Sequence, residues 1–170
     1  MERPGRTFSV RRATEYDDEA IVAILTGVAA ERIYTAIDMP WSVDEQRQYL
    51  KSLTPRETYH VAQTDRHTLV GYQSLDLYAP TLHSMAHVAQ LGTFLRPEWR
   101  RQGVGEALFA ATVEFARQHA YRKLVVQVRA SNTGAQAFYK RLGFQECGRL
   151  AKQVRIGDQD DDEILMELFV

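Results

Sequence analysis

The chain has 170 residues, 45% hydrophobic side chains and a formal net charge of −1, so it can bury a full core and shows no sign of disorder or of bulk nucleic-acid binding. Its single cysteine, Cys147, excludes a disulfide framework within the chain, and we expect a reducing, cytoplasmic setting. No apolar run approaches the length of a membrane span, and the start lacks a signal-peptide core. We expect one domain over residues 1–170, with no membrane or nucleic-acid partner and with residues 1–6 as a loose end.

The first third of the sequence predicts one strand and two helices. Apolar and polar side chains alternate over residues 8–12, which is typical of a half-exposed strand. A capping pattern that begins at Thr14 starts the first helix, and the apolar side chains after it recur at helical spacing. Residues 29–40 stay ambiguous, whereas a capping box that begins at Ser42 predicts a second helix over residues 43–53.

The rest of the sequence predicts strands that alternate with helices. Strands are expected over residues 59–64, 69–78, 88–95, 123–128, 149–156 and 163–169, and helices after residue 103 and over residues 132–142. An acidic loop over residues 157–162 should join the last two strands. This order predicts a mixed α/β fold with one central sheet and helices on both faces.

The segment between the strand 88–95 and the next helix combines glycines with positive charge. It consists of Arg100, Arg101, Gln102, Gly103, Val104 and Gly105. The first N–H groups of a helix have no partner inside the helix, and the helix dipole favours negative charge there. The two glycines let the backbone approach a phosphate, and the two arginines add charge at the same place. The segment therefore predicts a phosphate or pyrophosphate cradle.

Three alternative interpretations of this segment differ in the residues that they require. Two glycines before a helix also occur in tight turns that bind nothing, and the segment alone leaves that alternative open. A nucleoside-triphosphate P-loop requires a lysine, and none follows Gly105. A dinucleotide fingerprint requires a third glycine and an acidic residue after the next strand, but Leu108 and Arg129 stand there.

A second motif, NTGAQAFYKRLGF, occupies residues 132–144. Asn132 and Tyr139 are two helical turns apart, so they face the same way and lie about 10 Å apart along the axis. Small Ala135 between them would let an extended ligand lie close to the helix. A groove beside this face could meet an amide-bearing chain at Asn132 and a reacting atom at Tyr139, while Phe138 is expected to pack inward.

Together the two motifs resemble those of the GNAT superfamily of acetyl-coenzyme A-dependent N-acetyltransferases. Residues 100–105 resemble its pyrophosphate motif, Gln/Arg-x-x-Gly-x-Gly/Ala, and residues 132–144 resemble its second cofactor motif. Within the superfamily the layout is most similar to the phosphinothricin/amino-acid and ribosomal-protein-alanine N-acetyltransferase branches. The resemblance implies the GNAT acyltransferase fold, whose mixed, mostly antiparallel sheet has helices on both faces, with acetyl-CoA as cosubstrate and a homodimer as one expected assembly.

The resemblance also implies roles for individual residues. Phe94 and Leu95 would offer backbone groups to the pantetheine arm, as if the arm were an extra strand, and residues 100–105 would hold the pyrophosphate. Asn132 would hydrogen-bond the arm, and Tyr139 would lie near the thioester sulfur.

Acetyl transfer to an amine requires a neutral amine, a donor for the thioester oxygen and a proton for the leaving thiolate. We predict direct attack by a primary amine of a small molecule or peptide, with Tyr139 as general acid and the backbone N–H of Leu95 as the oxygen's donor. Cys147 is not expected to act as a nucleophile. Nothing in residues 28–58 or 78–87 names the amine.

The general base is not evident from the sequence. The GNAT family often places a carboxylate on the strand that leads into the cradle, but residues 88–95 contain no Asp or Glu. Glu31, His87 and a water held by Gln90 or Thr93 are candidates, and each has an ordinary surface or core role as its alternative. The missing carboxylate keeps open a catalytically inactive acyl-CoA-binding regulatory module, and an interaction protein that binds no cofactor is a further alternative.

Two other groups of side chains are of types that bind ligands. His83 and His87 are four residues apart in a predicted loop and strand, where they would not face together, so no metal site is expected. Tyr34, Trp41 and Tyr78 could line an acceptor pocket or pack in the core.

Overall fold

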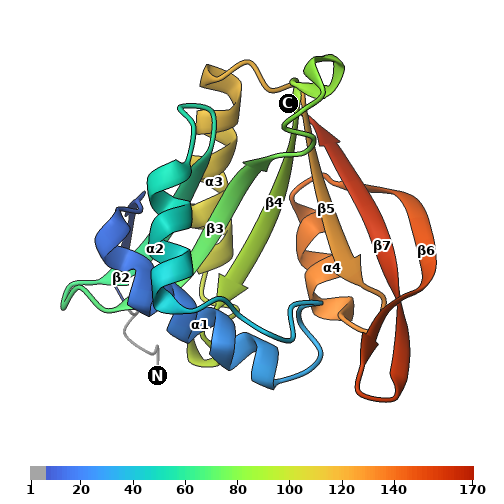
Figure 1. Ribbon diagram of the computed structural model, residues 1–170, viewed down its shortest axis with the longest axis horizontal. Coiled ribbons are helices and arrows are strands. Elements are labelled where there is room, and N and C mark those ends of the chain that lie inside the picture. The colour runs from blue at the N-terminus through green and yellow to red at the C-terminus, as the bar shows by residue number, and fades with distance from the viewer. Residues whose placement is uncertain (1–6) are drawn as a thin grey trace, which may run out of the picture.

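The computed structural model describes residues 7–170, and the predicted loose end, residues 1–6, lies outside the described residues. The strands are β1 (Phe8–Arg12), β2 (Thr58–Thr64), β3 (Leu69–Leu77), β4 (Val88–Leu95), β5 (Lys123–Arg129), β6 (Gln145–Ile156) and β7 (Gln159–Phe169). The α-helices are α1 (Asp18–Ala30), α2 (Val43–Ser52), α3 (Val104–Gln118) and α4 (Thr133–Arg141). This order of strands and helices is the one predicted (Figure 1).

Short-range sequence signals set the helix ends. Ser42 Oγ accepts a hydrogen bond from the N–H of Glu45, whose carboxylate accepts one from the N–H of Ser42, and this is the predicted capping box of α2. Thr14 and Asp17 form the same reciprocal arrangement around a short 3-10 turn that leads into α1. Gly143, with a φ of +95°, follows the end of α4 as predicted.

The predicted acidic loop over residues 157–162 is wrong. Only residues 157–158 form the turn, and the acidic side chains after it belong to β7. Their carboxylates pair with arginines of neighbouring strands: Asp160 with Arg155, Asp161 with Arg129, and Asp162 with Arg149. Opposite charges across adjacent strands offset the repulsion along the acidic run, so the run continues as a strand.

The described strands form one seven-stranded sheet in the order β1-β2-β3-β4-β5-β7-β6. Within it, every neighbouring pair is antiparallel except β4 with β5. That parallel pairing is short and joins only residues 88–90 to residues 123–125. Beyond Gln90 the two strands separate, and Figure 1 shows them diverging toward their carboxyl ends.

Helices cover both faces of the sheet, with α1 and α2 in front and α3 and α4 behind in Figure 1. On the front face, Ile21 and Ile24 of α1 pack with Tyr72 of β3. On the rear face, Leu108 of α3 packs with Val70 of β3, while other residues of α3 and α4 join the core beneath β5. The helical periodicity of the apolar side chains therefore determines which side of each helix turns toward the sheet.

Candidate active site

The carboxyl end of β4 directs part of its backbone away from β3. The N–H of Arg96 donates to the carbonyl of Val70 over 2.9 Å, and in an antiparallel pair such bonded positions alternate with positions that point away from the partner. Thr93 and Leu95 therefore direct their N–H and C=O groups toward the β5 side, where the pairing with β5 has already ended. In the part of the chain that the structure describes, these groups have no partner strand.

The start of α3 presents bare backbone amides. Gly103 precedes the helix with a φ of +81°, a conformation that favours glycine, and it supplies no side-chain cap. A Cβ at Gly105 would lie 3.0 Å from the ring of Phe138, so the glycine keeps the space between α3 and α4 open. The exposed Arg101 beside them forms no ion pair with any described carboxylate.

Arg100 has a different environment from Arg101. Its guanidinium forms two hydrogen bonds with the Glu31 carboxylate, at 2.9 and 2.5 Å, and lies 4.2 Å from the ring centroid of Tyr34. Hydrogen bonding to Glu31 raises the pKa of Arg100. The pair fastens the cradle segment to the residue that follows α1, so Glu31 is held by an arginine rather than free as a base.

The N-terminus of α4 is capped by Asn132. Its side-chain oxygen accepts a hydrogen bond from the N–H of Ala135 over 3.0 Å, while its side-chain nitrogen makes a long contact of 3.4 Å to the carbonyl of Tyr34. The amide oxygen is thus already used by the helix, and the amide nitrogen is the group that could reach a ligand.

Tyr139 is buried on α4, but its hydroxyl reaches β4. The hydroxyl shares a hydrogen bond of 2.8 Å with Thr93 Oγ1, which also accepts one from Gln73 Nε2. Burial raises the pKa of Tyr139 to about 12, against a smaller lowering effect of Thr93. The phenol therefore keeps its proton at neutral pH and lies where β4 leaves β5.

These parts enclose a cavity of ≈ 680 Å³, here called the β4–β5 cavity. Eight predicted site residues line it, namely Leu95, Arg100, Arg101, Gly103, Gly105, Asn132, Ala135 and Tyr139. Three others do not: Val104 is buried against the sheet, Gln102 bonds the carbonyl of Glu98, and Phe94 faces the opposite side of the sheet. Phe138, predicted to pack inward, also lines the cavity.

A second cavity, of ≈ 370 Å³, lies on the α1–α2 face of the sheet and is here called the aromatic cavity. Its walls include Trp41, Tyr49, Tyr59, Tyr72 and Phe94, which come from a loop, a helix and three strands. Gly92 and Phe94 of β4 face it, whereas Thr93 and Leu95 face the β4–β5 cavity. A single strand therefore separates the two cavities.

Asp76 is a carboxylate in the aromatic cavity that the sequence analysis missed. It is on β3, directly opposite Gln90 of β4, and accepts a very short hydrogen bond from the hydroxyl of Tyr49. Burial raises its pKa, an effect that hydrogen bonds from Tyr49 and Ser74 reduce. The carboxylate absent from β4 thus has a counterpart on the adjacent strand. The sequence signal that could have revealed Asp76 is an acidic residue in one strand of a predicted hairpin, opposite a polar residue in the other.

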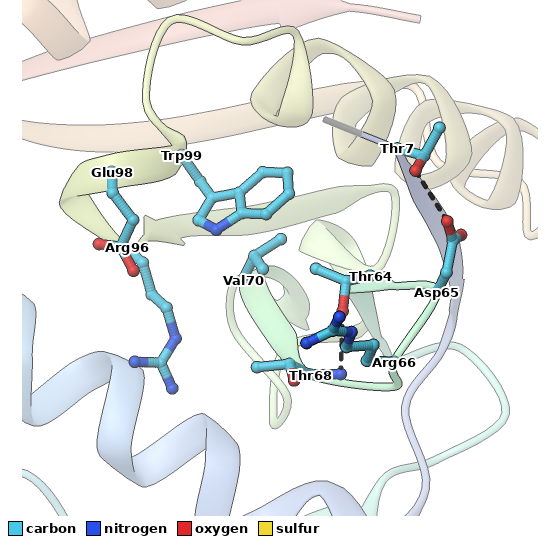
Figure 2. Close-up of a pocket in the computed structure, with 9 residues that line it drawn as sticks. All are labelled: Thr7, Thr64, Asp65, Arg66, Thr68, Val70, Arg96, Glu98 and Trp99. Atoms are coloured by element: carbon cyan, nitrogen blue, oxygen red, sulfur yellow. Dashed lines mark hydrogen bonds between the residues drawn. The ribbon is translucent and has the colours of Figure 1, made fainter. Parts of the chain in front are cut away.

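A third hollow, of ≈ 640 Å³, lies beside the β2–β3 turn (Figure 2). Its walls include Arg66, Arg96 and Trp99, and Figure 2 shows the Thr7 hydroxyl donating to Asp65 at its edge. It is comparable in volume to the β4–β5 cavity but contains none of the predicted site residues. We therefore assign the candidate site to the two cavities that flank β4.

The remaining candidates lie apart from the β4–β5 cavity or have structural partners. His87 lies in the turn just before β4, where its carbonyl accepts hydrogen bonds from the backbone of Arg122 and Lys123. Cys147 is exposed on β6, and desolvation raises the pKa of its thiol. Among residues 7–170, no group of three His, Cys, Asp or Glu side chains could hold a metal, and no helix is long and apolar enough to cross a membrane.

Comparisons with known proteins identify the family of this chain. The model of the acetyltransferase (GNAT) family matches residues 27–144. A Bacillus subtilis protein of the ribosomal protein bS18-alanine N-acetyltransferase type is 31% identical over 127 residues, which is 75% of this chain and 78% of that protein.

Solved structures show the same fold. A ribosomal-protein-alanine N-acetyltransferase from Brucella melitensis has a TM-score of 0.88 at 24% identity and covers 95% of this chain and 98% of its own. A phosphinothricin acetyltransferase from Sinorhizobium meliloti, solved with acetyl-CoA, has a TM-score of 0.89 at 21% identity over 96% of this chain and 89% of its own. The chain belongs to the acetyltransferase (GNAT) family, with its mostly antiparallel α/β fold, and is an acetyl-CoA-dependent N-acetyltransferase.

Proposed function

We propose that this enzyme transfers the acetyl group of acetyl-CoA to a primary amine of a small molecule or peptide by direct attack, with Tyr139 as general acid. The observation that carries the proposal is the Tyr139 hydroxyl, bonded to Thr93 where β4 and β5 separate. Tyr139 is a buried proton donor that lines the same cavity as the end of β4 and the predicted pyrophosphate cradle.

The described residues fit acetyl-CoA as cosubstrate. The backbone groups of Thr93 and the carbonyl of Leu95 would pair with the amides of the pantetheine arm, and the bare N–H groups of residues 104–106 would hold the pyrophosphate. Arg101 would add a positive charge, and the nitrogen of Asn132 would donate to the arm. Bound acetyl-CoA supplies a thioester whose acetyl carbon is open to attack by a neutral amine.

The backbone N–H of Leu95 is our proposed donor to the thioester oxygen as negative charge develops on it. Leu95 points this group away from β3 and into the region beside Tyr139. A donor fixed in the main chain does not need to reorient when charge appears, which is the main advantage of such preorganised sites.

Once the carbon–nitrogen bond has formed, Tyr139 gives its proton to the sulfur as the carbon–sulfur bond breaks. The nitrogen then loses its extra proton to become the amide, and that proton restores the phenol. Burial raises the pKa of the phenol to about 12, and the same burial raises the pKa of a thiol released beside it. The proton transfer therefore does not have to overcome the full difference between a buried phenol and a thiol in water.

Asp76 is the proposed acceptor of the amine's proton. An amine of ordinary basicity, with a pKa of about 10.4, arrives mostly protonated at neutral pH and must lose a proton before it attacks. Asp76 is partly buried on β3, directly opposite Gln90 of β4, at the level where β4 and β5 part. It attracts the ammonium and takes its proton directly or through a bound water.

The test is the variant Tyr139→Phe, assayed by thiol release with acetyl-CoA and a panel of amines. We expect kcat to fall about 100-fold, which is within the usual contribution of a general acid, while the dissociation constant of acetyl-CoA changes by less than about twofold. Unchanged turnover would show that Tyr139 is not the acid. Tyr78→Phe, on an exposed side chain outside both cavities, is the matched control.

A further inference from the structure

The side chains that line the aromatic cavity differ in charge, polarity and shape from those of the β4–β5 cavity. We infer that the aromatic cavity takes a primary amine that carries an apolar or aromatic body and a neutral hydrogen-bond acceptor, and that it rejects acceptors with an anionic group. This inference rests on the proposed function, because it assigns the amine of that reaction to this cavity.

Charge is the first argument. Among the described residues that line the cavity, Asp76 carries the only formal charge, and no Arg, Lys or His stands among them. Elsewhere in the described chain, the buried carboxylates of Asp17 and Asp18 are paired with arginines. Asp76 instead accepts from the Tyr49 hydroxyl, so an ammonium group would supply the cation that the protein does not.

An unpartnered amide is the second, independent argument. Gln46 of α2 is 3% exposed, lines the cavity, and its Nε2 has no acceptor within hydrogen-bonding geometry. Burial raises the pKa of the Tyr59 hydroxyl, and the nearby side chains of Ser74 and Gln46 reduce that effect, but the approach of Gln46 Nε2 does not reach hydrogen-bond geometry. A buried donor without a partner destabilises the site, and a carbonyl or ether oxygen of a ligand would supply the missing acceptor.

The walls explain the preference for an apolar body. Trp41 and Tyr49 have ring centroids 5.0 Å apart, Tyr59 stacks on Tyr72 at 5.6 Å, and Tyr72 stacks on Phe94 at 4.9 Å. This chain of rings runs from the loop before α2 across three strands. With ≈ 370 Å³, the cavity is at the lower end of the range for small-molecule sites, about 300–1,000 Å³, and suits one side chain with its amine.

The same walls disfavour an acceptor that carries a carboxylate or phosphinate. Such a group would share the cavity with Asp76, and neither charge would meet a cation there. Like charges in a partly desolvated site repel strongly, so each anionic acceptor should bind less well than its neutral counterpart.

A matched set of four amines tests the inference: phenylalanine amide, phenylalanine, phenethylamine and glycine amide. With saturating acetyl-CoA, we expect kcat/KM for phenylalanine amide to exceed that for phenylalanine and for glycine amide by at least about tenfold each, and that for phenethylamine by about threefold to tenfold. A phenylalanine-initiated peptide tests whether the neutral acceptor comes from a chain or a free amide, and either source supports the inference. Phenylalanine used as well as its amide would overturn it while the proposed function stands.

The variant Gln46→Leu tests the unpartnered amide. Leucine removes the donor and keeps an apolar side chain of similar size, so we expect the ratio of phenylalanine amide to phenethylamine to fall toward one. Gln48→Leu, on the exposed face of the same helix, should leave the ratio as it is in the unaltered enzyme. A ratio that stays unchanged in Gln46→Leu would overturn the assignment of this donor.

Binding can be followed without turnover. Trp41 lines the cavity, whereas Trp99, the other tryptophan of the chain, lines the third hollow, so a fluorescence change on adding phenylalanine amide that is lost in Trp41→Phe reports this cavity. Such binding without acetyl transfer to any amine would contradict the proposed function and support the cavity's selectivity. No Trp41 response to the amide, with acetylation still proceeding, would place the acceptor elsewhere and overturn the inference.

Discussion

The two cavities that flank β4 are built from different parts of the chain. The β4–β5 cavity presents mainly main-chain groups: the free side of β4, the uncapped start of α3, and small residues such as Gly105 and Ala135. The aromatic cavity presents side chains from α2, the loop before it and three strands. The β4–β5 cavity can bind a ligand through main-chain amides, which depend little on residue type. Binding in the aromatic cavity depends on which side chains line it.

This difference indicates a division of work along one strand. Side chains at alternate positions of β4 face opposite sides, so Thr93 lies against Tyr139 while its neighbours Gly92 and Phe94 face the rings. Changes on one side should therefore alter the use of acetyl-CoA, and changes on the other should alter the use of the amine. The variants below test this separation.

Asp76→Asn should have the largest effect. We expect kcat/KM for the amine to fall about 100-fold with little change in the KM for acetyl-CoA, because the variant removes the proposed base from the aromatic cavity only. Steady-state kinetics with each substrate varied in turn measures both. Asp65→Asn, on the β2–β3 turn, is the control. If Asp76→Asn raised the KM for acetyl-CoA by a comparable factor, the two cavities would not act separately.

The pH profile of the same variant sharpens this prediction. Burial raises the pKa of Asp76, and the groups that act on it are Glu57 together with the hydroxyls of Tyr49 and Ser74. A base works when deprotonated, so kcat/KM should fall as the pH drops through this raised pKa, and Asp76→Asn should lose that limb. Tyr139, with a pKa of about 12, stays protonated over the same range.

Gly105→Ala should act on the other cavity. Its new Cβ would lie 3.0 Å from Phe138, so the ring must move into the space that we assign to acetyl-CoA. We expect the dissociation constant of acetyl-CoA to rise about tenfold while the preference among amines stays the same. Gly27→Ala, where a Cβ would meet nothing within 4 Å, is the control for the substitution itself.

Arg101→Ala should weaken acetyl-CoA binding by about fivefold to tenfold, because one exposed charge-assisted contact is lost. The effect should shrink as salt is added, and isothermal titration at two ionic strengths measures it. Arg66→Ala, on an exposed arginine of the third hollow, should leave binding unchanged. An equal effect of the two variants would mean that only net charge matters.

Thr93→Val should have the smallest effect. It removes the hydroxyl that hydrogen-bonds Tyr139 and Gln73, and we expect kcat to fall about threefold to tenfold as the phenol loses its positioning. Thr93→Ser keeps the hydroxyl and should restore most of the rate. If Thr93→Ser is as slow as Thr93→Val, the methyl group rather than the hydrogen bond is responsible.

The β4–β5 cavity could be predicted from the sequence to the extent that it depends on local signals. Gly103, Gly105 and the Asn132–Tyr139 spacing are short-range features, and the structure places those residues around one cavity. The partner of Arg100 could not be predicted, because Glu31 approaches it only after α1 has packed on the sheet. The capping role of Asn132 was missed because the helix prediction started at Asn132 instead of after it.

The aromatic cavity could not be predicted because it is assembled by long-range pairing. Asp76 becomes notable only when β3 sets it opposite Gln90 and α2 brings Tyr49 to it. Trp41, which the sequence left between an acceptor pocket and the core, lines this cavity and is exposed, and its role toward an acceptor stays a prediction. The hairpin of β6 and β7 shows the same limitation, since its acidic run suggested a loop until three arginines from neighbouring strands were found beside it.

The alternating sides of β4 also bear on how such an enzyme can change over generations. A mutation that alters a ring around Asp76 leaves the amides beside Leu95 in place, since a main-chain contact does not depend on the identity of its residue. If the aromatic cavity binds the amine, single side-chain replacements there can change the acceptor preference while the main-chain contacts proposed for acetyl-CoA stay unchanged. A laboratory library restricted to the ring-lined wall should yield altered amine preferences more often than one of equal size around the nucleotide end.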